Sequence, residues 1–222
     1  MKNVPTLKTQ ISQTTTASST VNLYRPFGPM IAVIKMPDEL VKNLNVYTDT
    51  VIDSSPQLDH GDKLVGNVKQ ERRIEPDAIQ NLGWGKFLFD CVKFWVNSAS
   101  KKTITKFEIH SSWIVRQFEN EYNPAHTHQG HISGVGYLKL PRSFGETVQQ
   151  GKNINKNGCI DFIHGSQSFL SPSILSVTPE VGDLYLFPNH LMHSVYPFFG
   201  EGERRSVSFN ASIDSDIYNS LD

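Results

Sequence analysis

The sequence predicts a mainly β domain in which helices precede the strands, and three observations support this class. Residues 37–102 carry apolar side chains at helical spacing. After Lys102 the apolar residues alternate with polar ones, in short segments rich in β-branched and aromatic residues. Gly, Asn and Pro separate these segments. Short strands with frequent turns favour an antiparallel sandwich or barrel, and we expect the helices to buttress one face of its sheets.

Length and composition indicate one domain of ordinary size. The chain has 222 residues, of which 38% are hydrophobic and 10% aromatic, enough to build a core. Residues 1–22 are rich in Thr and Ser, so we expect a loosely ordered arm there. Residues 23–222 are expected to form a single domain, with helical support over about 37–102 and the barrel over about 103–213.

Two helices are predicted in the supporting region. Pro37 and the acidic residues after it are typical of a helix start, and apolar residues then recur at helical spacing: Leu40, Leu44, Tyr47 and Val51. Residues 77–102 predict a second and longer helix, whose apolar stripe consists of Phe87, Leu88, Cys91, Val92 and Trp95. The polar segment between them, residues 54–76, contains Gly and Pro and predicts a loop.

Alternating segments place the predicted strands in the second half of the chain. They lie within residues 103–119, 131–141, 157–165, 173–188 and 204–213. The segment 173–188 is expected to hold two strands, joined by a turn at Gly182 and Asp183.

Charge and cysteine content exclude some classes of function. The formal net charge is -1, without a long run of either sign, so no nucleic-acid footprint is indicated. No apolar stretch approaches the roughly 20 residues that span a membrane. The first residues lack the apolar run of a secretory signal, and the two distant cysteines, Cys91 and Cys159, are most simply reduced. We therefore expect a cytoplasmic protein.

Histidines are concentrated in one part of the chain. Six of the eight lie between positions 126 and 193. His126 and His128 stand two apart just before a predicted strand, so in extended backbone both imidazoles point to the same side. His193 follows the strand "DLYLFP", and strand ends meet in a sandwich. A single histidine at a strand end is most often an exposed polar residue, but this pair with a distal histidine favours a metal site.

The last strand carries a second unusual pattern. Arg204 would share one face with Ser206, Ser208 and Asn210, while Arg205, Val207 and Phe209 would occupy the other. A polar face inside a barrel implies a ligand, and a buried guanidinium there is costly unless it meets an anion such as a carboxylate. Two alternatives stay open: an exposed strand with ordinary polar alternation, and a register slipped by one residue that would put Arg205 in this role.

These segments together resemble a known family. "HTHQGHISGVGY", then "GDLYLFP", then "FPNHLMHSVYP" and finally "RRSVSFN" are similar to the iron(II)- and 2-oxoglutarate-dependent oxygenases. The similarity is to a branch that occurs in bacteria and in phages of marine cyanobacteria. It covers residues 105–213 strongly, and the N-terminal third less specifically.

The resemblance implies a double-stranded β-helix, a cupin-like jelly-roll barrel, with iron at one mouth. The metal ligands would be His126, His128 and His193, although most of the superfamily has Asp or Glu where this chain has His128. Arg204 would bind the far carboxylate of the co-substrate 2-oxoglutarate. Ser206 or Tyr137 would assist it. The implied reaction uses O₂, releases succinate and CO₂, and hydroxylates a substrate that the sequence does not identify.

Other residues near the motifs are weaker candidates. Trp113, Arg116 and Gln117 lie on the strand before the histidine pair, where they could reach co-substrate or substrate. Asp161 and Asp183 are the carboxylates that could replace His128 as a ligand. Four other histidines, and Asn123 before Pro124, are not expected to bind the metal: His110, His131, His164 and His190.

Two other functions remain open at this point. One is a cupin-like metal enzyme of another class, such as a three-histidine dioxygenase, a hydrolase or an isomerase. The other is a non-catalytic barrel that acts as a structural or binding module, for example in a virion. Arg204 distinguishes the 2-oxoglutarate-dependent oxygenase from these two alternatives, because only the oxygenase needs a buried anion site beside the metal. The oligomeric state is open, with a homodimer among the options.

Overall fold

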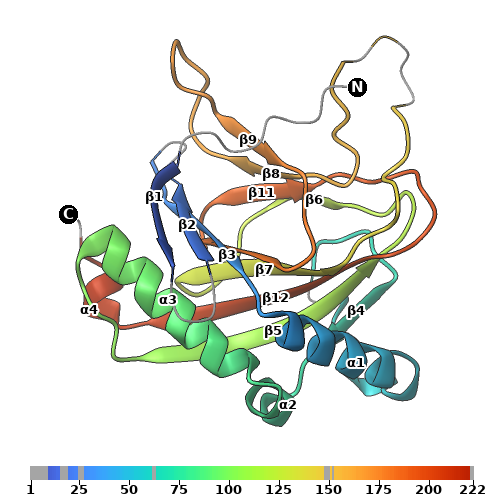
Figure 1. Ribbon diagram of the computed structural model, residues 1–222, viewed down its shortest axis with the longest axis horizontal. Helices are drawn as coiled ribbons and strands as arrows, with labels where there is room; N and C mark the ends of the chain where they lie inside the picture. The colour runs from blue at the N-terminus through green and yellow to red at the C-terminus, as the bar shows by residue number, and fades with distance from the viewer. Residues whose placement is uncertain are drawn as a thin grey trace.

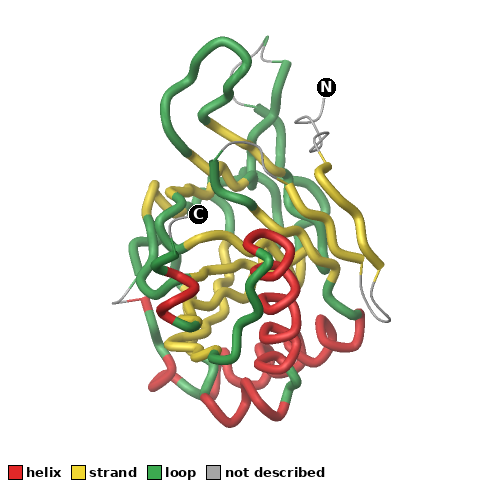
Figure 2. Tube along the Cα trace, turned by 90° about the vertical axis from the view of Figure 1, so that its left-hand side faces the viewer, coloured by secondary structure: helices red, strands yellow, loops and turns green. Residues whose placement is uncertain are grey.

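The computed structural model describes residues 10–15, 20–24, 28–61, 64–147, 151 and 153–220. Two antiparallel β-sheets dominate the structure, and the helices gather on the outer side of the larger sheet (Figures 1 and 2). The larger sheet has the strand order β1-β2-β3-β10-β7-β12-β5-β4, and the smaller has β6-β11-β8-β9. The mainly β class with helical support is therefore confirmed.

The strands and helices have the following bounds. The larger sheet contains β1 (Gln10–Thr15), β2 (Thr20–Tyr24), β3 (Ile31–Lys35), β4 (Gln70–Arg73), β5 (Phe107–Gln117), β7 (Ile132–Lys139), β10 (Asp183–Pro188) and β12 (Arg204–Ile213). The smaller sheet contains β6 (Asn123–His126), β8 (Ile160–Ile163), β9 (Ile174–Val177) and β11 (Met192–Val195). The helices are α1 (Asp38–Ser54), the short 3₁₀ helix η1 (Pro56–Leu58), α2 (Pro76–Asn81), α3 (Trp84–Ser100) and α4 (Ser215–Tyr218).

The path of the chain between the two sheets defines the fold. From β5 to β12 the chain passes back and forth between the sheets, with β5, β7, β10 and β12 in one and β6, β11 and the consecutive strands β8 and β9 in the other. This is the winding of a jelly-roll, or double-stranded β-helix, as the sequence resemblance implied. Strands that are distant in sequence become neighbours in this way, and β6 pairs with β11.

Helices α1 and α3 pack on the outer face of the larger sheet. Leu88 and Val92 of α3 are fully buried and belong to the same apolar cluster as Val207 and Phe209 of β12. The Phe209 ring meets Trp84 edge-on, with 6.1 Å between the ring centroids. Burial of this kind supplies most of the stability of a helix on a sheet. Among the described helices, none combines the length and the apolar character needed to cross a membrane.

A second apolar cluster fills the space between the two sheets. It contains Tyr137, Tyr185 and Phe187 from the larger sheet and Phe162 from the smaller one. These side chains alternate along their strands with residues that face the helices or solvent, which is the period of two expected of a strand. The barrel interior is therefore packed, and only part of it is left open as a cavity.

The supporting region differs from its prediction in two places. The predicted long helix over 77–102 is two helices, α2 and α3, because Gly83 between them has φ of 75°, a left-handed conformation that glycine adopts readily. The predicted loop over 54–76 contains η1 and the four-residue strand β4, which adds to the edge of the sheet beside β5.

Part of the segment that was expected to be a loosely ordered arm, residues 1–22, forms strands. Residues 10–15 form β1, and β2 begins at Thr20; the two strands pair with each other and β2 pairs with β3. Backbone pairing at a sheet edge needs no apolar pattern, which is why this Thr- and Ser-rich segment gave no signal. The rest of the predicted arm, residues 1–9 and 16–19, lies outside the described residues.

Candidate metal centre and anion site

Three histidines from two adjacent strand segments converge at one end of the barrel. His126 ends β6 and lies directly opposite His193 of β11 in the strand pairing, while His128 follows β6. The ring centroids of His126 and His193 are 4.3 Å apart, and those of His128 lie 4.9 Å from His126 and 5.0 Å from His193. One ligand atom from each ring lies within 4.8 Å of the others. This is the convergence that a metal ion requires.

The backbone orients two of the three rings. His126 Nδ1 lies 2.7 Å from the carbonyl oxygen of Pro124, and His193 Nδ1 lies 3.0 Å from that of Leu191. An Nδ1–H that donates to a carbonyl leaves Nε2 as a lone-pair donor, the usual arrangement behind a metal-bound histidine. The Nε2 atoms of His128 and His193 are 3.2 Å apart. Nitrogens this close together could be held by one metal ion.

The electrostatic environment keeps these imidazoles neutral. Burial, together with the neighbouring rings of His126 and His128, lowers the pKa of His193 to about 3. Burial and His126 lower the pKa of His128 to about 4, and burial also lowers that of His126. Neutral imidazoles are the form that binds metal, so the site does not need to lose protons at neutral pH.

The other candidate ligands lie elsewhere. His131 stacks on Tyr218, with 3.9 Å between centroids, and its Nδ1 accepts a hydrogen bond from the Ile213 amide. Asp161 forms an ion pair with Lys156, and Asp183 forms one with Lys35. Among the described residues, His126, His128 and His193 form the one group of three or more ligating side chains. The remaining histidines lie outside that group: His60 beside Trp113, His110 beside Ser212, His164 beside Gly28, and His190 in an exposed turn.

Arg204 lies in the same cavity and is 2% exposed. Its Nη1 donates to Gln117 Oε1 at 2.6 Å, and its Nη2 donates to the Tyr137 hydroxyl at 3.0 Å. The guanidinium carbon lies 4.9 Å from the centroid of the Tyr137 ring. Its Nε has no hydrogen-bond partner, and no carboxylate among the described residues forms an ion pair with it. A buried cation without an anion is costly, so this guanidinium is suited to an anionic ligand.

Gln117 and Tyr137 hold the guanidinium in place. The Gln117 amide nitrogen donates to the carbonyl oxygens of Glu121 and Tyr196, which fixes its Oε1 toward Arg204. Tyr137 is fully buried in the interior cluster, where burial raises its pKa despite the nearby guanidinium. Ser206, two residues along β12, lines the cavity on the same face as Arg204. The four residues predicted to bind the co-substrate are therefore together.

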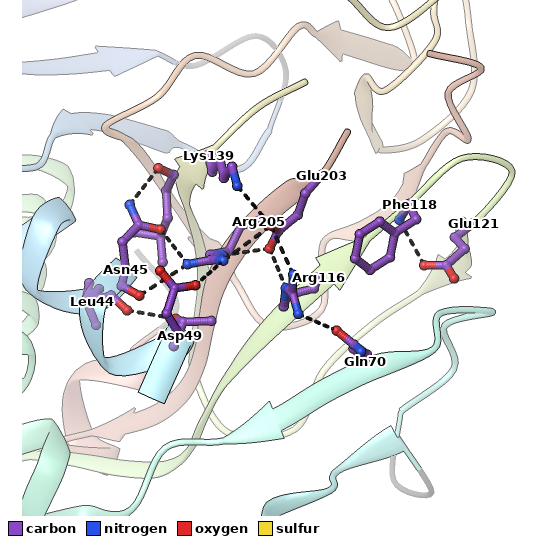
Figure 3. A network of polar contacts seen from close by, with 12 residues as sticks. Leu44, Asn45, Asp49, Gln70, Arg116, Phe118, Glu121, Lys139, Glu203 and Arg205 are labelled. Carbon is purple, nitrogen blue, oxygen red and sulfur yellow. Dashed lines mark hydrogen bonds and ion pairs between the residues drawn. The ribbon is translucent and has the colours of Figure 1, made fainter. Parts of the chain in front are cut away.

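Arg205 faces the opposite side of the sheet (Figure 3). It donates to Glu203 at 2.7 Å and 3.2 Å and to Asp49 of α1 at 2.7 Å. Arg116 donates to the same Glu203 at 2.6 Å and to Gln70 at 2.7 Å, so it also points away from the cavity. Both arginines form ion pairs with carboxylates, and these contacts link α1, β4, β5 and β12. The register that exposes Arg204 to the cavity is thus the one the alternation predicted.

The cavity between the sheets has a volume of about 100 Å³. It contains the three histidines and Arg204, and a ring of other residues completes its wall: Leu64, Val65, Glu71, Trp113, Val115, Gln117, Asn123, Thr127, Gly134, Val135, Ile160, Phe187, Val195, Ser206 and Ser208. Trp113 is therefore a wall residue as predicted, and Asn123 is one although a turn role was expected. Glu71 was missed because its strand, β4, is short and polar and gives no periodic signal.

Comparison with known proteins agrees with this geometry. Residues 111–210 match the model of a family described as "Putative 2OG-Fe(II) oxygenase". No curated protein matches the chain. Solved structures with a similar fold exist, at low sequence identity.

The first is the viral collagen prolyl hydroxylase of Paramecium bursaria Chlorella virus-1, as its 2OG complex: TM-score 0.51, 15% identity, covering 82% of this chain and 94% of that one. The second is a prolyl hydroxylase from Trichoplax adhaerens with a hypoxia inducible factor peptide: TM-score 0.53, 13% identity, covering 86% and 87%. The third is HygX from Streptomyces hygroscopicus with nickel and 2-oxoglutarate: TM-score 0.53, 12% identity, covering 82% and 81%.

These structures support the fold, and the family match covers the segment that carries the histidines and Arg204. Residues 111–210 of the jelly-roll barrel are therefore similar to the 2-oxoglutarate- and iron(II)-dependent oxygenases.

Proposed function

We propose that this protein is an iron(II)- and 2-oxoglutarate-dependent dioxygenase that hydroxylates its substrate. The observation that carries the proposal is Arg204: a guanidinium 2% exposed, with an unpaired Nε, in the same cavity as three converging imidazoles. A metal site alone would explain the histidines. The buried Arg204 cation beside them favours a dianionic co-substrate, with one end at the metal site and the other at Arg204.

In this proposal His126, His128 and His193 bind the iron. The donor set fits, because three neutral imidazole nitrogens are good ligands for iron(II) and leave coordination positions for other groups. When bound, iron supplies the activation of dioxygen that couples conversion of 2-oxoglutarate to succinate and CO₂ with hydroxylation of the substrate. The carbonyl groups of Pro124 and Leu191 hold two of the rings so that Nε2 faces inward.

Arg204 binds the distal carboxylate of 2-oxoglutarate. Its unpaired Nε and the planar fork of its guanidinium allow a bidentate contact with a carboxylate. Gln117 and Tyr137 already hold two of its nitrogens, so little side-chain entropy is lost when the anion arrives. The hydroxyl of Ser206, on the same strand face, is a further donor for that carboxylate.

Apolar side chains restrict water around the metal site. Phe187 lies against His193, with 4.8 Å between ring centroids, and Ile160 and Val195 complete this wall of the cavity. A dry wall strengthens the electrostatic contacts within the site and limits side reactions. The two cysteines are free and buried, in keeping with the cytoplasmic location that we propose.

A second candidate is a three-histidine dioxygenase that does not use 2-oxoglutarate. The observation that favours it is His128, which stands where most of the superfamily has a carboxylate and leaves the metal with its full charge. Such an enzyme has no use for a buried anion site, so the response to 2-oxoglutarate separates the two candidates.

The test is thermal unfolding with manganese(II), with and without 2-oxoglutarate. Manganese should raise the Tm, and 2-oxoglutarate should raise it further only when manganese is present, because a ligand of the native state stabilises by mass action. 2-Oxobutyrate, which lacks the distal carboxylate, should give a much smaller increase.

Two variants provide the controls. His126→Ala should lose both shifts, and His131→Ala, a histidine outside the metal group, should keep them. Absence of any shift with manganese and 2-oxoglutarate together would overturn the proposal. A shift with manganese alone, unchanged by 2-oxoglutarate, would favour the three-histidine candidate.

A further inference from the structure

Glu71 lines the cavity but belongs neither to the proposed metal site nor to the proposed co-substrate site. It lies on β4, at the edge of the larger sheet, lines the cavity and is 1% exposed. Neither of its carboxylate oxygens has a hydrogen-bond partner among the described residues. A buried carboxylate without a partner is destabilising, so its presence in the cavity wall needs a reason.

A second unpaired acceptor lies beside it. Asn123 Oδ1 is buried and has no hydrogen-bond partner among the described residues. A side-chain carbon built on Gly66 would lie 2.8 Å from Asn123 Oδ1 and 3.2 Å from Glu71 Oε1, so both oxygens pack against Gly66 and lie near each other. A larger residue at position 66 would press on both. Two unpaired acceptor groups from different strands are therefore neighbours in the cavity wall.

The surroundings of this pair are acidic. Burial, together with the nearby carboxylates of Asp59 and Glu121, raises the pKa of Glu71 to about 7. Asp59 already forms an ion pair with Arg72, and Glu121 accepts a hydrogen bond from the Phe118 amide. The site thus contains hydrogen-bond acceptors and negative charge in excess, and it would repel an anion.

The strand register separates this site from Arg204. Glu71 pairs with Val115 of β5, and Val115 pairs with Ser206 of β12. Neighbouring strands lie about 4.8 Å apart, so Glu71 is about 10 Å from Ser206 across the sheet. One cavity therefore presents a cation on β12 and a buried carboxylate on β4, with the histidines in the same wall.

We propose that Glu71 and Asn123 bind a protonated amine or guanidinium of the primary substrate. The inference rests on the proposed function, since it assigns the substrate class of that same cavity. A group with several N–H donors and a positive charge satisfies both acceptors at once, whereas a hydroxyl offers a single donor. The two charged sites then bind different ligands. Arg204 binds the dicarboxylate 2-oxoglutarate, and Glu71 binds the cationic end of the substrate.

Calorimetric titration of the protein loaded with manganese(II) and 2-oxoglutarate tests this. The probes are 1,4-diaminobutane, agmatine and the neutral 1,4-butanediol, together with the peptides Gly-Lys-Gly and Gly-Gln-Gly, which distinguish a free amine from a lysine side chain. At least one cationic probe should bind, its neutral counterpart should bind at least tenfold more weakly, and Glu71→Gln should weaken the cation at least tenfold. Glu108→Gln, which changes an exposed carboxylate on β5, should have no effect.

A second measurement separates substrate binding from a structural role. If Glu71 serves a ligand, Glu71→Met should raise the Tm of the ligand-free protein, because an unpaired buried carboxylate is removed. A lower Tm for Glu71→Met, or equal binding of every cationic probe to wild type and Glu71→Gln, would overturn the inference.

Failure of this inference is distinguishable from failure of the proposed function. The manganese and 2-oxoglutarate shifts of Glu71→Gln should equal those of wild type. If wild type itself shows no such shift, the oxygenase proposal fails, and the amine probes can still be titrated into the metal-free protein to test Glu71.

Discussion

Replacing Arg204 with Gln should remove 2-oxoglutarate binding while leaving the metal site intact. In the proposed complex the guanidinium and the distal carboxylate form a buried, charge-assisted contact, because Arg204 is 2% exposed and no carboxylate of the described chain neutralises it. Truncating one partner of such a pair costs about 2 to 5 kcal/mol. At about 1.4 kcal/mol for each factor of ten, the affinity for 2-oxoglutarate should fall by roughly 30-fold to 4,000-fold.

The assay is calorimetric titration of 2-oxoglutarate into protein loaded with manganese(II), supported by the KM for 2-oxoglutarate in succinate formation. The manganese affinity of Arg204→Gln should equal that of wild type, because the three imidazoles are untouched. Arg204→Lys should fall between the two, since it keeps the charge and loses the planar fork. A 2-oxoglutarate affinity within threefold of wild type in Arg204→Gln would refute the assignment of this residue.

The neighbouring arginine provides the matched control. Arg205→Gln removes the same chemical group from the other face of β12, where Glu203 and Asp49 bind it. Breaking a buried ion pair from one side costs about 3 to 5 kcal/mol of stability. Arg205→Gln should therefore lower the free energy of unfolding and leave 2-oxoglutarate affinity unchanged, the opposite of Arg204→Gln.

Three further predictions concern the metal set, acid stability and the core. His128→Asp should keep manganese binding in calorimetry, since two histidines and a carboxylate also bind such metals, whereas His128→Ala should weaken it at least tenfold. Arg116 and Arg205 outweigh burial and lower the pKa of Glu203 to about 2 from an ordinary value of 4.5, which corresponds to about 3 kcal/mol of stability. This contribution is present above about pH 4.5 and lost as the pH falls toward 2, so denaturant unfolding should show wild type and Glu203→Gln converging over that range; a constant difference would contradict it. Phe209→Ala should lower the free energy of unfolding by about 3 to 5 kcal/mol, because Phe209 is fully buried against Trp84; a loss below about 1 kcal/mol would show that the core closes around the gap.

The parts of the site that sequence could predict are those on periodic strands. His126 and His128 stand two apart, and the alternation of β12 separates Arg204 from Arg205, so side-chain direction followed from the period of two. His193 was joined to them because it follows a predicted strand directly, but spacing alone does not say which strand ends meet, and the resemblance to a family strengthened the choice. In the structure that meeting is the pairing of β6 with β11.

The parts that sequence could not predict depend on contacts between distant segments. Glu71 lies in a polar segment that was expected to be a loop, and it becomes a strand only because the edge of β5 is available for pairing. Asn45 and Asp49 bind Arg205 from α1, a contact that no local pattern encodes. The break at Gly83 was missed because the apolar spacing continues on both sides of it.

The arrangement of two consecutive arginines on β12 has a consequence for how this chain can change. Arg204 and Arg205 are consecutive in the sequence, but their side chains lie on opposite faces of the sheet. A substitution at either position therefore leaves the surroundings of the other side chain intact. An insertion of one residue directly after Arg205, with the rest of β12 kept in register, would instead reverse their directions, and would present to the cavity a guanidinium whose former partners are all on the far side. The protein should therefore tolerate amino-acid substitutions in β12 better than insertions or deletions.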